Sequence, residues 1–393
     1  MARSASLLTA GIVAGAILLG ILHLAAGDAA SRSLSLSLAL GAVFGVVLQR
    51  ARFCFFCHTR DLVEGGDPRG VLSILIALAV GAAGYVLVVG AWLPVPLPGR
   101  LPPDAHIGPV SVVLAGAAFA FGLGMAISGS CISAHLYRLG EGSPTSPFAL
   151  IGTIAGFVLG FLTWNTLYLA VISNAPVVWL PHHLGYAGTL GATFLVLALL
   201  AALALRFSRG TAEPVTSRPL DLRSVAHALF VARWPAAIGG IAVGVLSAAS
   251  YLRVGPLGVT AEIGSLARTA ANAAGWLPDT LHGLDTFRGC ATAIQTALLS
   301  ENGVFITGLV GASFVAALLA GQFAPRRPTG KDVVAGLAGG LLMGWGAMTA
   351  LGCTVGVLLS GIHAGALSGW VFLFASGAGL LAGLPLRRRL ASA

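Results

Sequence analysis

Three of the five cysteines in this chain of 393 residues begin short apolar segments, each too short to cross a membrane. They are Cys54 in Arg52 to Leu62, Cys131 in Gly129 to Tyr137, and Cys353 in Gly352 to Ile362. A thiol is a weak S–H donor with a polarizable sulfur, and a helix N-terminus presents unpaired N–H groups that favour anions. We therefore predict that these three cysteines contact an anion that carries both sulfur and oxygen atoms.

Residues beside these cysteines extend the candidate site. Gly129 and Gly352 would let the backbone approach an ion closely, and Arg52 would raise the anion concentration at the mouth of a path. His135 either donates a hydrogen bond to the substrate or is a core histidine whose hydrogen bonds are internal. The secondary candidates are Arg52, Gly129, Ser130, His135, Cys290 and Gly352.

The run Cys54-Phe-Phe-Cys57-His58 matches the C-x-x-C-H pattern of covalent haem attachment. That attachment takes place outside the cytoplasm, whereas four nearby arginines indicate that this segment faces the cytoplasm. A zinc site would need more ligands nearby than His58 supplies. We therefore expect no cofactor and no metal, and a redox pair of Cys54 and Cys57 is the alternative that remains open.

The sequence around these segments is that of a membrane protein. Hydrophobic residues make up 57% of the chain and charged residues 9%, whereas a soluble domain has about 25% charged residues. Ten stretches approach the length of about 20 apolar residues that a transmembrane helix needs. They are 5–26, 34–50, 70–92, 109–128, 147–172, 187–206, 235–251, 303–323, 332–350 and 364–386. We predict an all-α polytopic membrane protein, because these stretches lack the alternation of outer-membrane strands.

Basic residues are unevenly distributed between the two sides of the predicted membrane. With the N-terminus in the cytoplasm, 17 of the 22 Lys and Arg residues fall on the cytoplasmic side. This excess predicts an inner (cytoplasmic) membrane protein with both termini in the cytoplasm. It also explains most of the net charge of +9 without a nucleic-acid partner. The basic run 206–233 is then a cytoplasmic connector, and 5–26 is a retained helix rather than a signal peptide.

A pair of glycines followed by a cysteine occurs in the fourth stretch and again in the ninth. The two copies are Gly122-x-Gly124-(x)6-Cys131 and Gly344-x-Gly346-(x)6-Cys353. Because these stretches are five spans apart, they cross in opposite directions, which predicts two inverted repeats with a substrate site near the midplane. A single membrane domain, 1–393, then contains one repeat at 34–172, a connecting span and loop at 173–234, and a second repeat at 235–386. The alternative is that the glycines only allow close helix packing.

The short apolar segments are predicted to be half-membrane helices, which must be lined by protein or by a water-filled cavity. A fourth segment of this kind, Phe287 to Leu299, contains Cys290. Two charged pairs flank the segments, and we expect the second of them to close a turn. These pairs are Arg60 with Asp61, and Arg138 with Glu141.

At these residues the sequence resembles the YeeE/YedE family of membrane proteins, which includes thiosulfate uptake proteins and Sox-associated sulfur transporters. The motifs are Gln49-Arg50-Ala51-Arg52-Phe53-Cys54 with Arg60-Asp61, Gly122-Leu-Gly-Met-(x)3-Gly129-Ser-Cys131 with Tyr137-Arg138-Leu-Gly-Glu-Gly142, and Gly352-Cys353-Thr-Val-Gly356 with Leu359-Ser-Gly361. The resemblance implies an inverted-repeat fold with short helices directed at a constricted centre. It implies that Cys54, Cys131 and Cys353 contact thiosulfate and pass it inward, and that a cytoplasmic sulfur-carrier protein is a partner. Ser130 departs from the family, which usually has Gly directly before the second cysteine.

We therefore expect a transporter in the lipid bilayer, not an enzyme, that imports a small sulfur oxyanion, with thiosulfate as the first choice. The sequence has no phosphate loop and no ATP-binding domain, so transport powered by ATP within this chain is not expected. Two other functions stay open: a sulfur-responsive membrane sensor or signalling protein, and a membrane thiol oxidoreductase. Sulfite and related sulfur or selenium species are alternative substrates.

Overall fold

The computed structural model describes residues 2–97, 99–209, 221–287, 292–295 and 299–392. Ten helices in these ranges are long and apolar enough to cross a membrane. The same ranges contain no β-strand, only two isolated bridges, Pro109 with Val177 and Trp179 with Ala366. The predicted class, an all-α polytopic membrane protein, is confirmed.

Each long helix overlaps one of the ten predicted stretches. The long helices are α1 Ala2–Ala25, α2 Ala29–Ala51, α4 Arg69–Trp92, α5 Val112–Ser128, α7 Ser146–Ala170, α8 Leu180–Arg206, α10 Ala236–Arg253, α12 Glu301–Leu319, α13 Gly330–Thr349 and α15 Leu367–Ser392. The largest difference is at the start of α8, where the helix contains a non-helical Gly185 and the predicted stretch begins after it.

Shorter helices connect the long ones. They are α3 Phe55–Gly65, α6 Ile132–Gly140, α9 Leu222–Phe230, α11 Thr260–Ala273, the π-helix η3 Thr354–Ser360, α14 Gly361–His363, and the 3-10 turns η1 Ile172–Asn174 and η2 Leu284–Thr286. Three of the four predicted short segments are therefore helical, as α3, as α6, and as η3 with α14.

The prediction of a fourth short helix, from Phe287 to Leu299, is wrong for the residues that the structure describes. Residues 287, 292–295 and 299 are not helical. Residues 288–291 and 296–298, including Cys290, lie outside the described residues. The short helix of this region is α11, which the apolar pattern missed because it carries Glu262 and Arg268. Both side chains are buried, and polar partners from elsewhere in the chain compensate their charges. Glu262 accepts from Ser300 Oγ and Gln295 Nε2, and Arg268 binds Asp285 and the Thr292 carbonyl.

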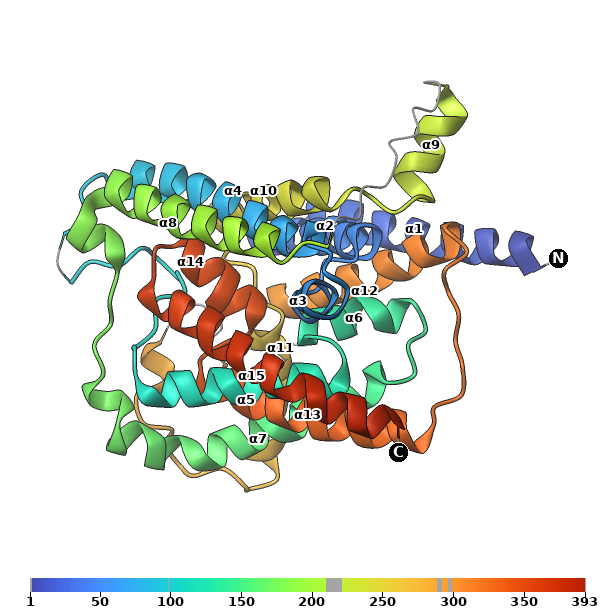
Figure 1. Cartoon of the computed structure of the whole chain (residues 1–393). Helices are drawn as coiled ribbons and strands as arrows, with labels where there is room; N and C mark the ends of the chain where they lie inside the picture. Colours follow the sequence, from blue (N-terminus) through green and yellow to red (C-terminus); the bar gives the residue numbers. More distant parts are fainter. Residues whose placement is uncertain (1, 98, 210–220, 288–291, 296–298, 393) are drawn as a thin grey trace.

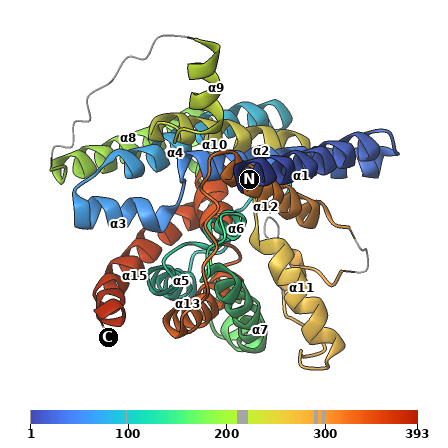
Figure 2. The same cartoon turned by 90° about the vertical axis from the view of Figure 1, so that its right-hand side faces the viewer.

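The long helices form two layers, which are visible in both views (Figure 1 and Figure 2). One layer contains α1, α2, α4, α8 and α10, and the other contains α5, α7, α13 and α15. Helix α12 packs under α1 and α2, and α6 lies between the layers. Both ends of the chain and α9 lie at the same end of the molecule, on the right of Figure 1; we call it the terminal end, and the opposite end the loop end.

The helix contacts occur in a regular set of pairs. Helix α2 packs on α12 and α10 on α4, while α7 packs on α13 and α15 on α5. Helices α5 and α13 also pack on each other, which places this antiparallel pair at the centre of its layer.

The two glycine-x-glycine motifs lie at close helix contacts in this layer. A Cβ on any of their four glycines would lie nearer to a backbone oxygen of the next helix than a real Cβ can come. The contacts are Gly122 with Ser376 of α15, Gly124 with Gly339 of α13, Gly344 with Thr153 of α7, and Gly346 with Ala117 of α5. In each motif the first glycine therefore meets an outer helix, and the second glycine meets the other central helix.

Replacing Gly122 or Gly344 by alanine should destabilise the protein, because the added methyl group meets a backbone carbonyl that cannot rotate away. We expect the free energy of unfolding to fall by about 1–3 kcal/mol or more, as for other overpacked cores. The measurement is the midpoint of thermal unfolding of the purified protein in detergent. Gly116→Ala in α5 is the control, because nothing lies within 4 Å of its Cβ position. Equal midpoints for all three variants would contradict the packing role.

Candidate functional site

Each of the three predicted cysteines is the N-cap residue of a short helix. Cys54 precedes α3, Cys131 precedes α6, and Cys353 precedes η3, and all three are 0% exposed. The chain breaks just before them at residues with positive φ, which are Arg52 at 53°, Gly129 at 85° and Gly352 at 151°. The first N–H groups of a helix have no partner within it. Each thiol therefore lies beside such groups in the protein interior.

Cys54, Cys57 and Cys131 form a group of three thiols between α3 and α6, which we call the thiol cluster. The Cys57 N–H donates to Cys54 Sγ at 3.4 Å, and the Cys54 thiol interacts with the thiols of both Cys57 and Cys131. Cys131 Sγ also lies 3.2 Å from Ser133 Oγ. The structure thus brings two of the three predicted cysteines together, and it adds Cys57 to them.

Cys353 has different neighbours. Its thiol interacts with the side chain of Thr260 and with backbone groups of Val259 and Gly356. Thr260 is the first residue of α11, so the helix that the apolar pattern missed builds one wall of this part of the site. Cys353 and the thiol cluster belong to one continuous buried core.

Two hydroxyl groups next to these thiols are buried and have no hydrogen-bond partner among the described residues. They are Ser130 Oγ, directly before Cys131, and Thr354 Oγ1, directly after Cys353. A buried hydroxyl without a partner costs about 1–3 kcal/mol, so such groups usually have a ligand or an ordered water. Ser130 was a sequence candidate, whereas Thr354 carried no signal beyond its position next to a cysteine.

The remaining secondary candidates differ in their placement. Arg52 is the C-cap of α2 and its side chain is exposed. His135 is buried; its Nδ1 lies 3.2 Å from Ser146 Oγ, whereas its Nε2 has no partner among the described residues. Cys290 lies outside the described residues.

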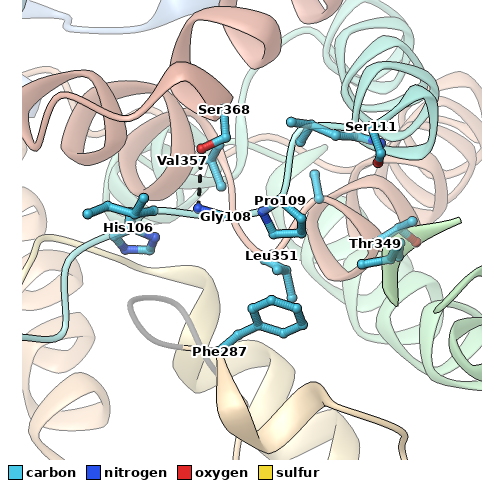
Figure 3. A pocket seen from close by; sticks show the side chains of 13 residues that line it. His106, Gly108, Pro109, Ser111, Phe287, Thr349, Leu351, Val357 and Ser368 are labelled. Atoms are coloured by element: carbon cyan, nitrogen blue, oxygen red, sulfur yellow. Dashed lines mark hydrogen bonds between the residues drawn. The ribbon is translucent and has the colours of Figure 1, made fainter. Parts of the chain in front are cut away.

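A small cavity lies at the loop end, next to the segment that leads to Cys353 (Figure 3). Its volume is about 20 Å³, enough for one water molecule and too small for a sulfur oxyanion. Leu351 and Phe287 lie close together in its lining, and Leu351 has a positive φ of 61°. Burial lowers the pKa of His106, another lining residue, to about 4, so this ring is neutral at pH 7.

Arg138 and Glu141 close the predicted turn through their backbones, because the Glu141 N–H donates to the Arg138 carbonyl at 3.1 Å, but their side chains do not pair. Arg138 lies two turns after Cys131 on the same face of α6, so it points to the thiol cluster, where its Nη2 donates to Cys57 Sγ at 3.1 Å. Glu141 lies past the end of α6, accepts a hydrogen bond from Gln49 Nε2 at 3.0 Å, and is 3.7 Å from Arg233. Arg138 is thus a residue of the site that the sequence interpretation placed elsewhere.

The predicted pair of Arg60 and Asp61 is present, with 2.6 Å between Nη2 and Oδ1. His58, the last residue of the haem-like motif, packs edge-on against the Phe53 ring at 5.9 Å. Among the described residues, no group of three His, Cys, Asp or Glu side chains is arranged to hold a metal ion.

Comparison with known proteins identifies relatives over most of the chain. The family described as Sulphur transport matches residues 50–382. A thiosulfate transporter TsuA of Spirochaeta thermophila is 31% identical over 353 residues, which cover 85% of this chain and 93% of that protein. A thiosulfate transporter TsuA of Escherichia coli is 27% identical over 342 residues, which cover 80% of this chain and 84% of that protein. A probable transporter YedE of Salmonella typhimurium is 27% identical over 164 residues, which cover 42% of this chain and 38% of that protein.

Mild oxidation of the purified protein should link Cys54 to Cys131 or to Cys57, because only these thiols lie next to Cys54 among the described residues. Cys353 should remain free of links to them. The measurement is mass spectrometry of peptides after digestion without reductant. Cys54→Ser is the control and should remove both links. A dominant link between Cys353 and Cys131 would contradict the described geometry.

Proposed function

The chain belongs to the sulphur transport family, and on this basis we propose that it imports a small sulfur oxyanion, with thiosulfate as the first choice, through the inner membrane. The observation that carries the proposal is the set of three fully buried cysteines, each at the start of a short helix. The relatives that cover most of the chain are named thiosulfate transporters, which agrees with a transporter and not with an enzyme.

In this proposal the anion enters at the loop end and passes the constriction at Leu351. It then contacts Cys353, moves to the thiol cluster, and leaves at the terminal end. Because the cavity beside Leu351 holds only about one water molecule, import requires an opening of this segment. The positive φ of Leu351 marks the backbone there as strained, which is typical of functional positions.

The groups along this path suit an anion that has a polarizable sulfur at one end and oxygen atoms at the other. Thiols offer a polarizable surface and weak S–H donors to the terminal sulfur. The Ser130 and Thr354 hydroxyls, which have no other partner among the described residues, would donate to the oxygens. Several weak contacts in series allow an anion both to bind and to leave, as in other selective pores.

We also propose that the two halves are inverted repeats. If α2–α7 were superimposed on α10–α15, α2 would correspond to α10, α4 to α12, α5 to α13 and α7 to α15. The contact of α2 with α12 would then correspond to the contact of α10 with α4, and the contact of α7 with α13 to the contact of α15 with α5. All four contacts occur. Under this exchange Cys131 corresponds to Cys353, and the start of α3 corresponds to the start of α11. Thr260 then contacts Cys353 in the second half as Cys54 contacts Cys131 in the first. This relation explains why two halves contribute three cysteines rather than four.

The distribution of basic residues supports a cytoplasmic terminal end. The thiol cluster would then be the last part of the path, where a cytoplasmic sulfur-carrier protein, implied by the family resemblance, would take over the substrate. Arg50 ties the connector before α10 to this end, because it is buried and donates to the carbonyl oxygens of Phe230 and Val231.

Thiosulfate uptake in cells that lack their own importer tests the proposal. Wild type should restore uptake, and Cys131→Ala and Cys353→Ala should each lower it by about tenfold or more, because each removes one contact of the path. The measurement is the initial rate of uptake of labelled thiosulfate, normalised to the amount of protein in the membrane.

Cys57→Ala separates transport from thiol oxidoreduction, the alternative that the contact between Cys54 and Cys57 favours. A transporter should keep measurable uptake in this variant, because Cys57 supplies at most one of several contacts along the path, whereas a redox pair loses all function. No uptake by well-expressed wild type would favour the sensor. Unchanged uptake in both Cys131→Ala and Cys353→Ala would rule out the cysteine path.

A further inference from the structure

Two arginines from different helices converge on the break between α5 and α6. Arg138 lies on α6, and its Nη1 donates to the Gly129 carbonyl at 3.4 Å. Arg387 lies on α15, and its Nη1 would be 2.6 Å from a Cβ on Gly129. Arg387 Nη1 also donates to the Ala126 carbonyl at 3.5 Å. Both guanidinium groups therefore lie at the end of α5, beside the thiol cluster.

Neither guanidinium group forms an ion pair with a carboxylate of the described residues. Two acidic side chains of α3 are bound to other arginines, Asp61 to Arg60 and Glu64 to Arg388. Two cations held close together without a carboxylate repel each other, and an anion between them removes that repulsion.

The surroundings orient both groups without using all their donors. Arg138 Nη2 donates to Cys57 Sγ at 3.1 Å. The Arg387 Cζ lies 4.9 Å from the centroid of the Phe56 ring, which is 0% exposed. A contact of this kind uses the face of the guanidinium group and leaves its in-plane N–H groups for an oxyanion.

We propose that Arg138, Arg387 and Cys57 form an inner anion-binding site, the last one that a divalent sulfur oxyanion occupies before release at the terminal end. The inference rests on the proposed transport function and adds to it a charged site beyond the three predicted cysteines. The guanidinium groups hold the oxygen atoms, and the Cys57 thiol faces the sulfur end. Two positive charges match the charge of thiosulfate.

The same chemistry would also bind free phosphate or the phosphate of a lipid headgroup. A small free oxyanion fits the position better, because both arginines are only partly exposed and lie next to buried thiols. The Arg138 contact with Cys57, which is 8% exposed, connects the site to the proposed path rather than to the lipid-facing surface.

The test uses full-length protein in detergent, in a Cys353→Ala background that weakens the outer part of the path. The measurement is the midpoint of thermal unfolding as sodium thiosulfate is raised, with sodium chloride at equal ionic strength as the reference. A bound anion raises this midpoint with a concentration dependence set by its affinity. The double variant Arg138→Gln/Arg387→Gln should need at least about tenfold more thiosulfate for the same rise. Sodium phosphate in place of thiosulfate tests selectivity for the sulfur end.

Arg388→Gln is the matched control, because it removes a neighbouring positive charge that binds Glu64 and should respond like the background protein. If the double variant does not unfold in a cooperative thermal transition, the single variants Arg138→Lys and Arg387→Lys are measured in its place. They keep the charge but lose the planar fork, and each should weaken the response. An unchanged thiosulfate response in the double variant, or in both lysine variants, would overturn the inner site. A rise that follows added anionic phospholipid and not thiosulfate would likewise overturn it, in favour of a headgroup site.

Uptake by wild type, measured separately, distinguishes the two proposals. Uptake by wild type together with an arginine-independent thiosulfate response would refute the inner site and leave the transport proposal intact. An arginine-dependent response without uptake would support the site and refute import.

Discussion

Every backbone N–H and C=O group inside a membrane must find a partner within the protein, and this requirement governs where the chain can break its helices. The breaks before Cys54, Cys131 and Cys353 leave polar groups in positions where lipid could not satisfy them. All three cysteines are fully buried, so the protein itself surrounds each break. The remaining helices can be understood as the packing that makes these breaks possible.

The glycine motifs provide much of that packing. They let α5 and α13 approach each other and their outer neighbours at backbone distance, so that the chain directly after each central helix is enclosed. Hydroxyl groups at Ser130 and Thr354 remain without partners among the described residues, so two of the enclosed breaks keep a polar group that these residues do not satisfy.

The long helices and three of the short ones could be predicted because apolar stretches and interruptions by glycine or cysteine are local signals. Helix α11 could not, because its charges are compensated by Gln295, Ser300 and Asp285, which are distant in sequence. The position of Arg138 was missed for a related reason. A nearby glutamate suggested a local pair, whereas the helical period places Arg138 on the face of Cys131. Arg387 comes from the other end of the chain, and no local pattern connects it with Gly129.

A structure of the protein with selenosulfate, the selenium analogue of thiosulfate, tests most directly whether the anion travels along the thiols. Anomalous scattering from selenium locates the soft end of the anion independently of the water structure. The cysteine path predicts selenium in contact with Cys353 or with the thiol cluster, at about 4 Å or less from a sulfur atom. Selenium bound at full occupancy only at sites remote from these cysteines would contradict it.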